Sequence, residues 1–150
     1  MHRLFEKHLN DFFRDITAFG GLWGYCTLVI LTAVMVGTYF AAQLVVALVI
    51  IYASAIIIRL LYFKERPNHE RHKSVLERID ASSFPSIHAA RITSMAYLFA
   101  RQVPELMIPS VLLALLVCAS RVYLRKHFVI DVVGGIVLGI VVSLLVKTYI

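Results

Sequence analysis

A histidine and an aspartate stand four positions apart near the C-terminal end of the chain, beside a serine and an arginine. Ser120 and Arg121 precede His127, and Asp131 follows it. If a helix begins near His127, its side chain and that of Asp131 share one helix face. The carboxylate could then accept the proton of one imidazole nitrogen and leave the other nitrogen as a nucleophile or base. Taken alone, the same cluster also fits a structural His–Asp pair at a membrane interface.

A second polar cluster occupies residues 83–88, which read Ser-Phe-Pro-Ser-Ile-His. Pro85 suits the first turn of a helix, and the free backbone N–H groups of such a turn favour a phosphate. The hydroxyl of Ser86 can donate a hydrogen bond, and His88 can act as an acid or a base. An N-capped helix with an interfacial histidine is the alternative interpretation.

The third cluster contains Arg59, Lys64, Arg66 and Pro67. An arginine fork matches two oxygen atoms of a phosphate group. Basic residues also snorkel at the end of a membrane helix, so this cluster alone has a second explanation.

The elements that must position these clusters are apolar helices. Of the 150 residues, 60% are hydrophobic and 16% are charged, whereas about a quarter of the residues in a soluble domain are charged. This composition excludes a soluble domain, a disordered chain and a multidomain architecture, and the continuous apolar runs exclude a membrane β-barrel. We expect one all-α integral membrane domain over residues 1–150, with about five transmembrane helices, placed at about 20–37, 41–63, 85–101, 105–120 and 130–149.

Two further segments complete this expectation. Residues 1–18 have the pattern of an amphipathic helix that lies in the membrane interface. Residues 64–83 form a polar loop, in which Val75, Leu76 and Ile79 favour one short amphipathic helix. With this order of helices, the three polar clusters reach the same face of the membrane.

The chain has a net charge of +6, and its basic residues lie between the apolar runs. This position favours acidic lipid headgroups or phosphate over nucleic acid as the partner. Of the fifteen Lys and Arg residues, only Arg101 and Lys147 lie away from the face that carries the clusters. The positive-inside rule places that face in the cytoplasm. However, basic residues can also be present because they bind a lipid headgroup. Their distribution alone therefore does not determine which side of the membrane they occupy.

Together the three clusters resemble the motifs of the type 2 phosphatidic acid phosphatase (PAP2) superfamily, which includes vanadium haloperoxidases and bacterial acid phosphatases. The family motif Ser-Arg-x5-His-x3-Asp is complete from Ser120 to Asp131. Its motif Pro-Ser-Gly-His reads Pro-Ser-Ile-His, with Ile87 in place of glycine. Its motif Lys-x6-Arg-Pro begins with Arg59 in place of lysine and ends with Arg66 and Pro67.

The resemblance implies a PAP2-like helical bundle and a phosphatase mechanism with a phosphohistidine intermediate. His127 is then the nucleophile, Asp131 orients it, and His88 is the acid and base. The expected phosphate-binding residues are Arg59, Arg66, Ser86, Ile87 and Arg121. We expect no metal and no cofactor, because the chain has no set of residues with metal-ligand spacing.

The expected substrate is a lipid phosphate in the bilayer. Compact bacterial relatives act on lipid A 1-phosphate, phosphatidylglycerophosphate, undecaprenyl diphosphate or phosphatidic acid, and the abundant charge of residues 64–83 favours a large headgroup such as lipid A. The resemblance favours the bacterial inner membrane and a periplasmic active site. A non-hydrolytic lipid-binding or transport protein and a haloperoxidase-like enzyme are the alternative functions, and the sequence leaves the oligomeric state open.

Overall fold

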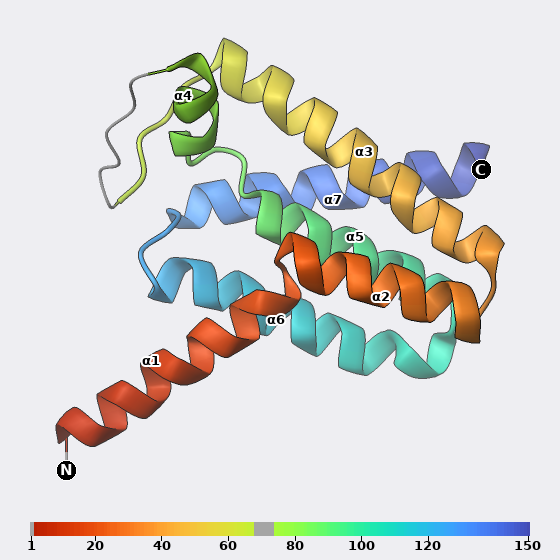
Figure 1. The fold of residues 1–150 in the computed structure, drawn as a ribbon, viewed down its shortest axis with the longest axis horizontal. Coiled ribbons are helices and arrows are strands. Elements are labelled where there is room, and N and C mark those ends of the chain that lie inside the picture. Colours follow the sequence, from red (N-terminus) through yellow and green to blue (C-terminus); the bar gives the residue numbers. More distant parts are fainter. Residues whose placement is uncertain (1, 68–73) are drawn as a thin grey trace.

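The computed structural model describes residues 2–67 and 74–150, and this part of the chain is helical without strands. Figure 1 shows the arrangement of the elements. In chain order they are α1 (His2–Phe19), α2 (Leu22–Met35), α3 (Thr38–Leu61), α4 (Val75–Ala81), α5 (Ile87–Gln102), the short 3₁₀ helix η1 (Pro104–Leu106), α6 (Met107–Tyr123) and α7 (Val129–Tyr149).

Helix α5 lies at the centre of the bundle and packs against α3, α6 and α7 (Figure 1). Small side chains allow α5 to pack closely against its neighbours in this central position. Ala89 and Ala90, at the start of the helix, are fully buried. Ser94 is buried one turn later and accepts a hydrogen bond from Ser143 of α7, with 2.8 Å between the hydroxyl oxygens. The helix that carries His88 is therefore held on three sides.

Two glycines of α7 allow it to lie directly against the backbone of α5. A Cβ atom added at Gly135 would stand 2.4 Å from the carbonyl oxygen of Ser86, and one added at Gly139 would stand 2.5 Å from that of Ala90. Real Cβ atoms do not approach backbone oxygens so closely, so a larger residue would push the two helices apart. The glycines thus fix the distance between α5 and α7.

The described helices confirm the all-α membrane class, and by length and composition three or four of them qualify as membrane spans. Three helical segments are long and apolar enough to cross a membrane: Thr38–Leu61, Pro104–Tyr123 and Val129–Tyr149. The pair Leu4–Phe19 and Leu22–Met35 forms a fourth candidate, although a bend of 51° separates its halves. The region expected at 85–101 became α5, which has 16 residues and a low mean hydropathy because it carries polar side chains on its buried face.

Large apolar side chains cover the outer faces of α3, α6 and α7. Examples are Val49, Ile57, Leu112 and Leu145, all of which are exposed in the isolated chain. A bilayer is the environment that such a surface requires, since water would not solvate it favourably. The chain is an integral membrane protein.

The amphipathic N-terminal segment forms α1, which begins outside the bundle and ends against α6 (Figure 1). The ring of Phe13 lies 4.4 Å from that of Tyr123, measured between centroids. Leu4, Phe5 and Phe12 are exposed on α1. These contacts fit an interfacial position, which stays a prediction.

The polar loop between α3 and α5 is closed at its base by hydrogen bonds. The backbone N–H of Ser83 donates to the carbonyl of Lys64 at 2.7 Å, and its hydroxyl donates to the carbonyl of Glu65 at 3.0 Å. The short helix expected in this loop is α4. The charged residues Glu70, Arg71 and Lys73 of the predicted loop lie outside the described residues.

Candidate active site

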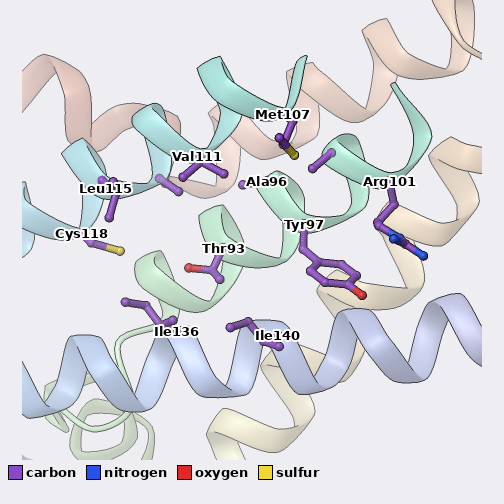
Figure 2. A pocket seen from close by; sticks show the side chains of 12 residues that line it. Thr93, Ala96, Tyr97, Arg101, Met107, Val111, Leu115, Cys118, Ile136 and Ile140 are labelled. Carbon is purple, nitrogen blue, oxygen red and sulfur yellow. The ribbon is translucent and has the colours of Figure 1, made fainter. Parts of the chain in front are cut away.

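Two of the cavities beside α5 differ in character. The first has a volume of about 450 Å³ and lies between α5, α6 and α7 (Figure 2). Its lining is apolar apart from Thr93, Tyr97 and Arg101, which Figure 2 shows along α5. With one cation at its end and no histidine, it cannot hold and cleave a phosphate ester. Its apolar lining is suited to contact with a hydrocarbon chain.

The second cavity has a volume of about 270 Å³ and is rich in charged and polar groups. Its walls come from the end of α3, the polar loop, the first turns of α5, the end of α6 and the link before α7. The lining residues are Tyr52, Arg59, Arg66, Asp80, Ile87, His88, Arg91, Arg121 and His127. Six of the eight predicted site residues are in this set, so the structure brings together clusters that are far apart in the sequence.

The imidazole of His127 has a defined orientation. Its Nδ1 lies 2.8 Å from the carbonyl oxygen of Ser83. A carbonyl can only accept a hydrogen bond, so Nδ1 carries the proton and Nε2 keeps a lone pair. Burial, together with the guanidinium groups of Arg121 and Arg66, lowers the pKa of His127 to about 3. The neutral ring with a free Nε2 is therefore the dominant form at neutral pH.

Asp131 does not orient His127 in the way that the i,i+4 spacing predicted. Its Oδ2 is 4.0 Å from Nδ1 of His127, beyond hydrogen-bond distance. Instead Oδ1 accepts from the ammonium group of Lys64 at 2.5 Å, and Oδ2 accepts from the backbone N–H of Phe128 at 2.8 Å. Both carboxylate oxygens are thus engaged by other donors, one of them in capping the first turn of α7, and the role of Asp131 toward His127 stays a prediction.

The three predicted phosphate-binding arginines reach the cavity from three segments. Arg59 donates to the carbonyls of Ile79 and Pro85 at 3.1 and 3.0 Å, and Arg66 donates to that of Asp80 at 2.6 Å. Arg121 donates to the hydroxyl of Thr17 at 3.0 Å. The contacts of Arg59 and Arg121 use backbone carbonyls and a hydroxyl, so they orient these two guanidinium groups without neutralising their charge. The cavity is consequently electropositive and suited to an anion.

Ser86 and Ile87 form the start of α5. Ser86 is fully buried, caps the helix by accepting from the N–H of Ala89 at 3.4 Å, and does not line the cavity. Ile87 lines the cavity and is the first residue of the helix, with an ordinary negative φ. Isoleucine therefore fits this position without backbone strain.

Several contacts near the site were not predicted from the sequence. Ser83 and Lys64 belong to the polar clusters, but their contacts with His127 and Asp131 cross the fold, and no local pattern pairs residues 44 and 67 positions apart. Arg91 and Tyr52 lie within helices whose sequences are typical of apolar membrane spans. The spacing of Arg91 three residues after His88 was the one signal available, because such residues share a helix face. Within the described ranges, no group of three or more His, Cys, Asp or Glu residues could hold a metal ion.

This constellation can be compared with known proteins. The sequence model of the PAP2 superfamily matches residues 61–150, which include His88, His127 and Asp131. The chain belongs to the PAP2 superfamily.

Two curated PAP2 relatives have similar sequences. Decaprenylphosphoryl-5-phosphoribose phosphatase of Mycobacterium tuberculosis is 31% identical over 101 residues, which cover 65% of this chain and 54% of the relative. Undecaprenyl-diphosphatase BcrC of Bacillus subtilis is 36% identical over 93 residues, which cover 59% of this chain and 47% of the relative. The chain thus spans about half the length of these relatives.

Two solved PAP2 structures share the fold. The transmembrane PAP2-type phosphatidylglycerolphosphate phosphatase of Bacillus subtilis superposes with a TM-score of 0.75 at 26% identity, covering 94% of this chain and 76% of the other. LpxE of Aquifex aeolicus superposes with a TM-score of 0.80 at 22% identity, covering 94% and 86%. The similarity to LpxE establishes the fold alone.

Proposed function

We propose that this protein is a membrane lipid phosphatase that works through a phosphohistidine intermediate. The observation that carries this proposal is the cavity in which His127 and His88 meet the guanidinium groups of Arg59, Arg66 and Arg121. Its position at the ends of membrane helices, together with PAP2 membership, supports a substrate that is anchored in the bilayer.

In the first step, Nε2 of His127 attacks the phosphorus atom. The carbonyl of Ser83 holds the proton on Nδ1, so the attacking nitrogen needs no base. The ring becomes positively charged as the P–N bond forms, and the carboxylate of Asp131 stabilises this charge from 4.0 Å. Asp131 then acts on His127 by electrostatic attraction between the carboxylate and the charged ring, rather than through a hydrogen bond.

The leaving oxygen departs with a proton from His88, which afterwards activates water to hydrolyse the phosphohistidine. Arg59, Arg66 and Arg121 stabilise the oxygens of the transferring phosphoryl group. Removal of one such donor from an enzyme typically costs about 2.7–4 kcal/mol of transition-state stabilisation. Ile87 can add its backbone N–H at the start of α5, whereas Ser86 contributes by capping that helix.

The substrate class is a lipid phosphomonoester or diphosphate, and the location is the bacterial inner membrane. We place the active site on the periplasmic face. A cysteine introduced at Ser74, which is exposed beside α4, tests this orientation in intact cells. Labelling by an impermeant maleimide before permeabilisation supports the periplasmic face, and labelling only afterwards refutes it.

The two histidines provide the sharpest test of the mechanism. His127→Ala cannot form a phosphoenzyme, whereas His88→Ala can still be phosphorylated by p-nitrophenyl phosphate, because its leaving group needs little protonation. His88→Ala then lacks the base for hydrolysis, so an acid-labile, base-stable phosphohistidine should accumulate. His8→Ala, on the exposed part of α1, is the matched control and should behave as wild type.

Label trapped in His127→Ala instead would reverse the assignment of the two residues. Absence of label in both variants would remove the support for a covalent route. Phosphate release from purified lipid phosphates separates the phosphatase from a protein that only binds or transports lipids. Oxidation of halide in the presence of vanadate would indicate a haloperoxidase.

A further inference from the structure

The apolar cavity of Figure 2 and the candidate active site lie on opposite sides of α5. From this helix, Ile87, His88 and Arg91 line the active-site cavity. The residues of α5 that line the apolar cavity are Thr93, Ala96, Tyr97, Ala100 and Arg101. At 3.6 residues per turn, the centres of these two sets are about 160° apart around the helix axis. A substrate whose phosphate lies beside His88 therefore has α5 between it and the apolar cavity, which makes the cavity a separate site.

The apolar cavity exists because α6 and α7 both pack along α5 but make few contacts with each other. Small side chains form its floor, among them the buried Ala96 and Ala114. Its rim includes Val111 and Leu115, which are 45% and 58% exposed, so the cavity is open toward the bilayer. An apolar hollow is not a site for ordered water, and at this depth hydrocarbon is the medium that fills it.

The dimensions of this cavity match one leaflet of a bilayer. Along α6 its lining runs from Met107 to Cys118, which is about 16 Å at 1.5 Å per residue. The hydrocarbon core of a bilayer is about 30 Å thick, so one leaflet contributes about half of that. The cavity volume of about 450 Å³ lies within the range of about 300–1,000 Å³ that is typical of ligand sites. An acyl chain from a single leaflet fits this space.

A positive charge stands at one end of the apolar cavity. Arg101 is the one charged residue among the described lining residues, and it lies in the last turn of α5, at the end remote from His88. Figure 2 shows the side chain of Tyr97 beside it. No carboxylate within the described ranges forms an ion pair with Arg101, and Glu105, which follows α5, does not line the cavity. A guanidinium group in this position is suited to the phosphate of a lipid headgroup.

We propose that the apolar cavity binds an acyl chain of an anionic phospholipid from the leaflet opposite the active site, with the phosphate of that lipid at Arg101. The chain lies between α6 and α7 and supplies packing that these helices do not give each other. Because α5 separates this lipid from His88, it is bound without being hydrolysed. The proposal therefore does not depend on the proposed phosphatase activity.

The experiment uses phosphatidylglycerol with a photoactivatable diazirine in its acyl chain, added to the purified full-length protein in neutral detergent. Mass spectrometry of the labelled peptides should place the label on the cavity-lining parts of α5 and α6. Unlabelled phosphatidylglycerol should compete at about fivefold lower concentration than phosphatidylcholine with the same chains, the factor expected for one basic residue at a lipid surface. Arg101→Gln should abolish this preference, and Arg101→Lys should retain it.

The matched control is Lys147→Gln, which removes an exposed cation near the end of α7 that does not line the cavity. It should keep the preference for phosphatidylglycerol. Val111→Trp is a second, independent variant, because it fills the cavity from the exposed side of α6. It should abolish labelling of the cavity-lining peptides while phosphate release from a lipid phosphate continues.

Equal competition by the two lipids in the wild-type protein, or equal loss of the preference in Arg101→Gln and Lys147→Gln, would overturn the anionic lipid site. Loss of label on addition of vanadate would assign the cavity to the tail of the substrate instead. Cross-links between two chains would assign it to a second copy of the protein. If Val111→Trp does not fold, Arg101→Gln and Arg101→Lys decide the question by the ratio of the two lipids.

Discussion

Replacing Asp131 by asparagine separates two roles that a carboxylate near a catalytic histidine can have. If Asp131 fixed the tautomer of His127, the substitution would put the proton on the wrong nitrogen. In this structure the carbonyl of Ser83 performs that task at 2.8 Å, and Asp131 lies 4.0 Å from Nδ1. Asparagine keeps the shape and can still accept from the N–H of Phe128, so the substitution removes mainly the charge.

The size of the effect follows from the distance. Two unit charges 4 Å apart interact by about 4 kcal/mol at an effective dielectric constant of about 20. The ammonium group of Lys64, 2.5 Å from the other carboxylate oxygen, offsets part of this attraction. If about half remains, Asp131→Asn should raise the barrier to phosphorylation of His127 by about 2 kcal/mol, or about 30-fold in rate. Loss of the correct tautomer would instead cost about 10⁴-fold.

The assay is the rate of phosphohistidine formation in a His88→Ala background, with p-nitrophenyl phosphate as the donor. Asp131→Asn is compared with Asp11→Asn, which changes an exposed carboxylate on α1. Nitrogen NMR of labelled histidine checks that the proton of His127 remains on Nδ1. A loss near 10⁴-fold, or a proton on Nε2, would refute the assignment of tautomer control to Ser83.

Three further predictions follow from the same geometry. Because burial and nearby arginines lower the pKa of His127 to about 3, its ring should stay neutral by NMR from pH 8 to about 5; a titration midpoint near the ordinary value of about 6.5 would contradict this. Ile87→Gly should retain phosphatase activity and lower the unfolding free energy by at least about 1 kcal/mol, because glycine is a poor helix former and the partly buried isoleucine packs against the core, and a tenfold gain in turnover would instead show that isoleucine obstructs the pocket. Gly139→Ala should lower the unfolding free energy by about 1–3 kcal/mol through overpacking, because its Cβ would meet the carbonyl of Ala90, whereas the same midpoint as wild type in thermal unfolding would contradict the close approach of α5 and α7.

Metal independence, expected from the sequence, stays a prediction and is tested separately. Full turnover in excess EDTA is the expected result, since the arginines supply the positive charge that a metal would supply. Loss of activity on chelation, with recovery on addition of Mg²⁺, would contradict it. Vanadate should inhibit competitively, because it mimics the five-coordinate transition state of phosphoryl transfer.

The sequence predicted the part of the site that depends on helix order and on motif spacing. Because α3, α5 and α6 alternate in direction, the ends that carry Arg66, His88 and Arg121 had to meet. The sequence did not predict contacts made by loop backbone, such as Ser83 with His127, because a carbonyl acceptor has no residue-type signature. Arg91 was missed because a single charge in an apolar run gives a weak signal until its cavity is known.

The helices that length and hydropathy select as spans differ from the expected set for a related reason. Hydropathy treats every helix as if lipid surrounded it, whereas α5 is surrounded by other helices. A helix in that position needs small residues for packing, and it can carry Arg91 and Ser94 because protein groups hydrogen-bond to them. Its length and hydropathy are therefore not those of a lipid-facing span.

The closed base of the polar loop has a consequence for how this protein can change. Ser83 bonds to Lys64 and Glu65 before the chain enters α5, so the loop leaves and returns at adjacent points. Lengthening a loop beyond such a junction adds little free energy, because closure entropy grows only with the logarithm of its length. An insertion or deletion beyond this junction should therefore leave His127 and His88 in the same relative position. The outer part of the loop can then vary by insertion and deletion while the reacting groups keep their spacing.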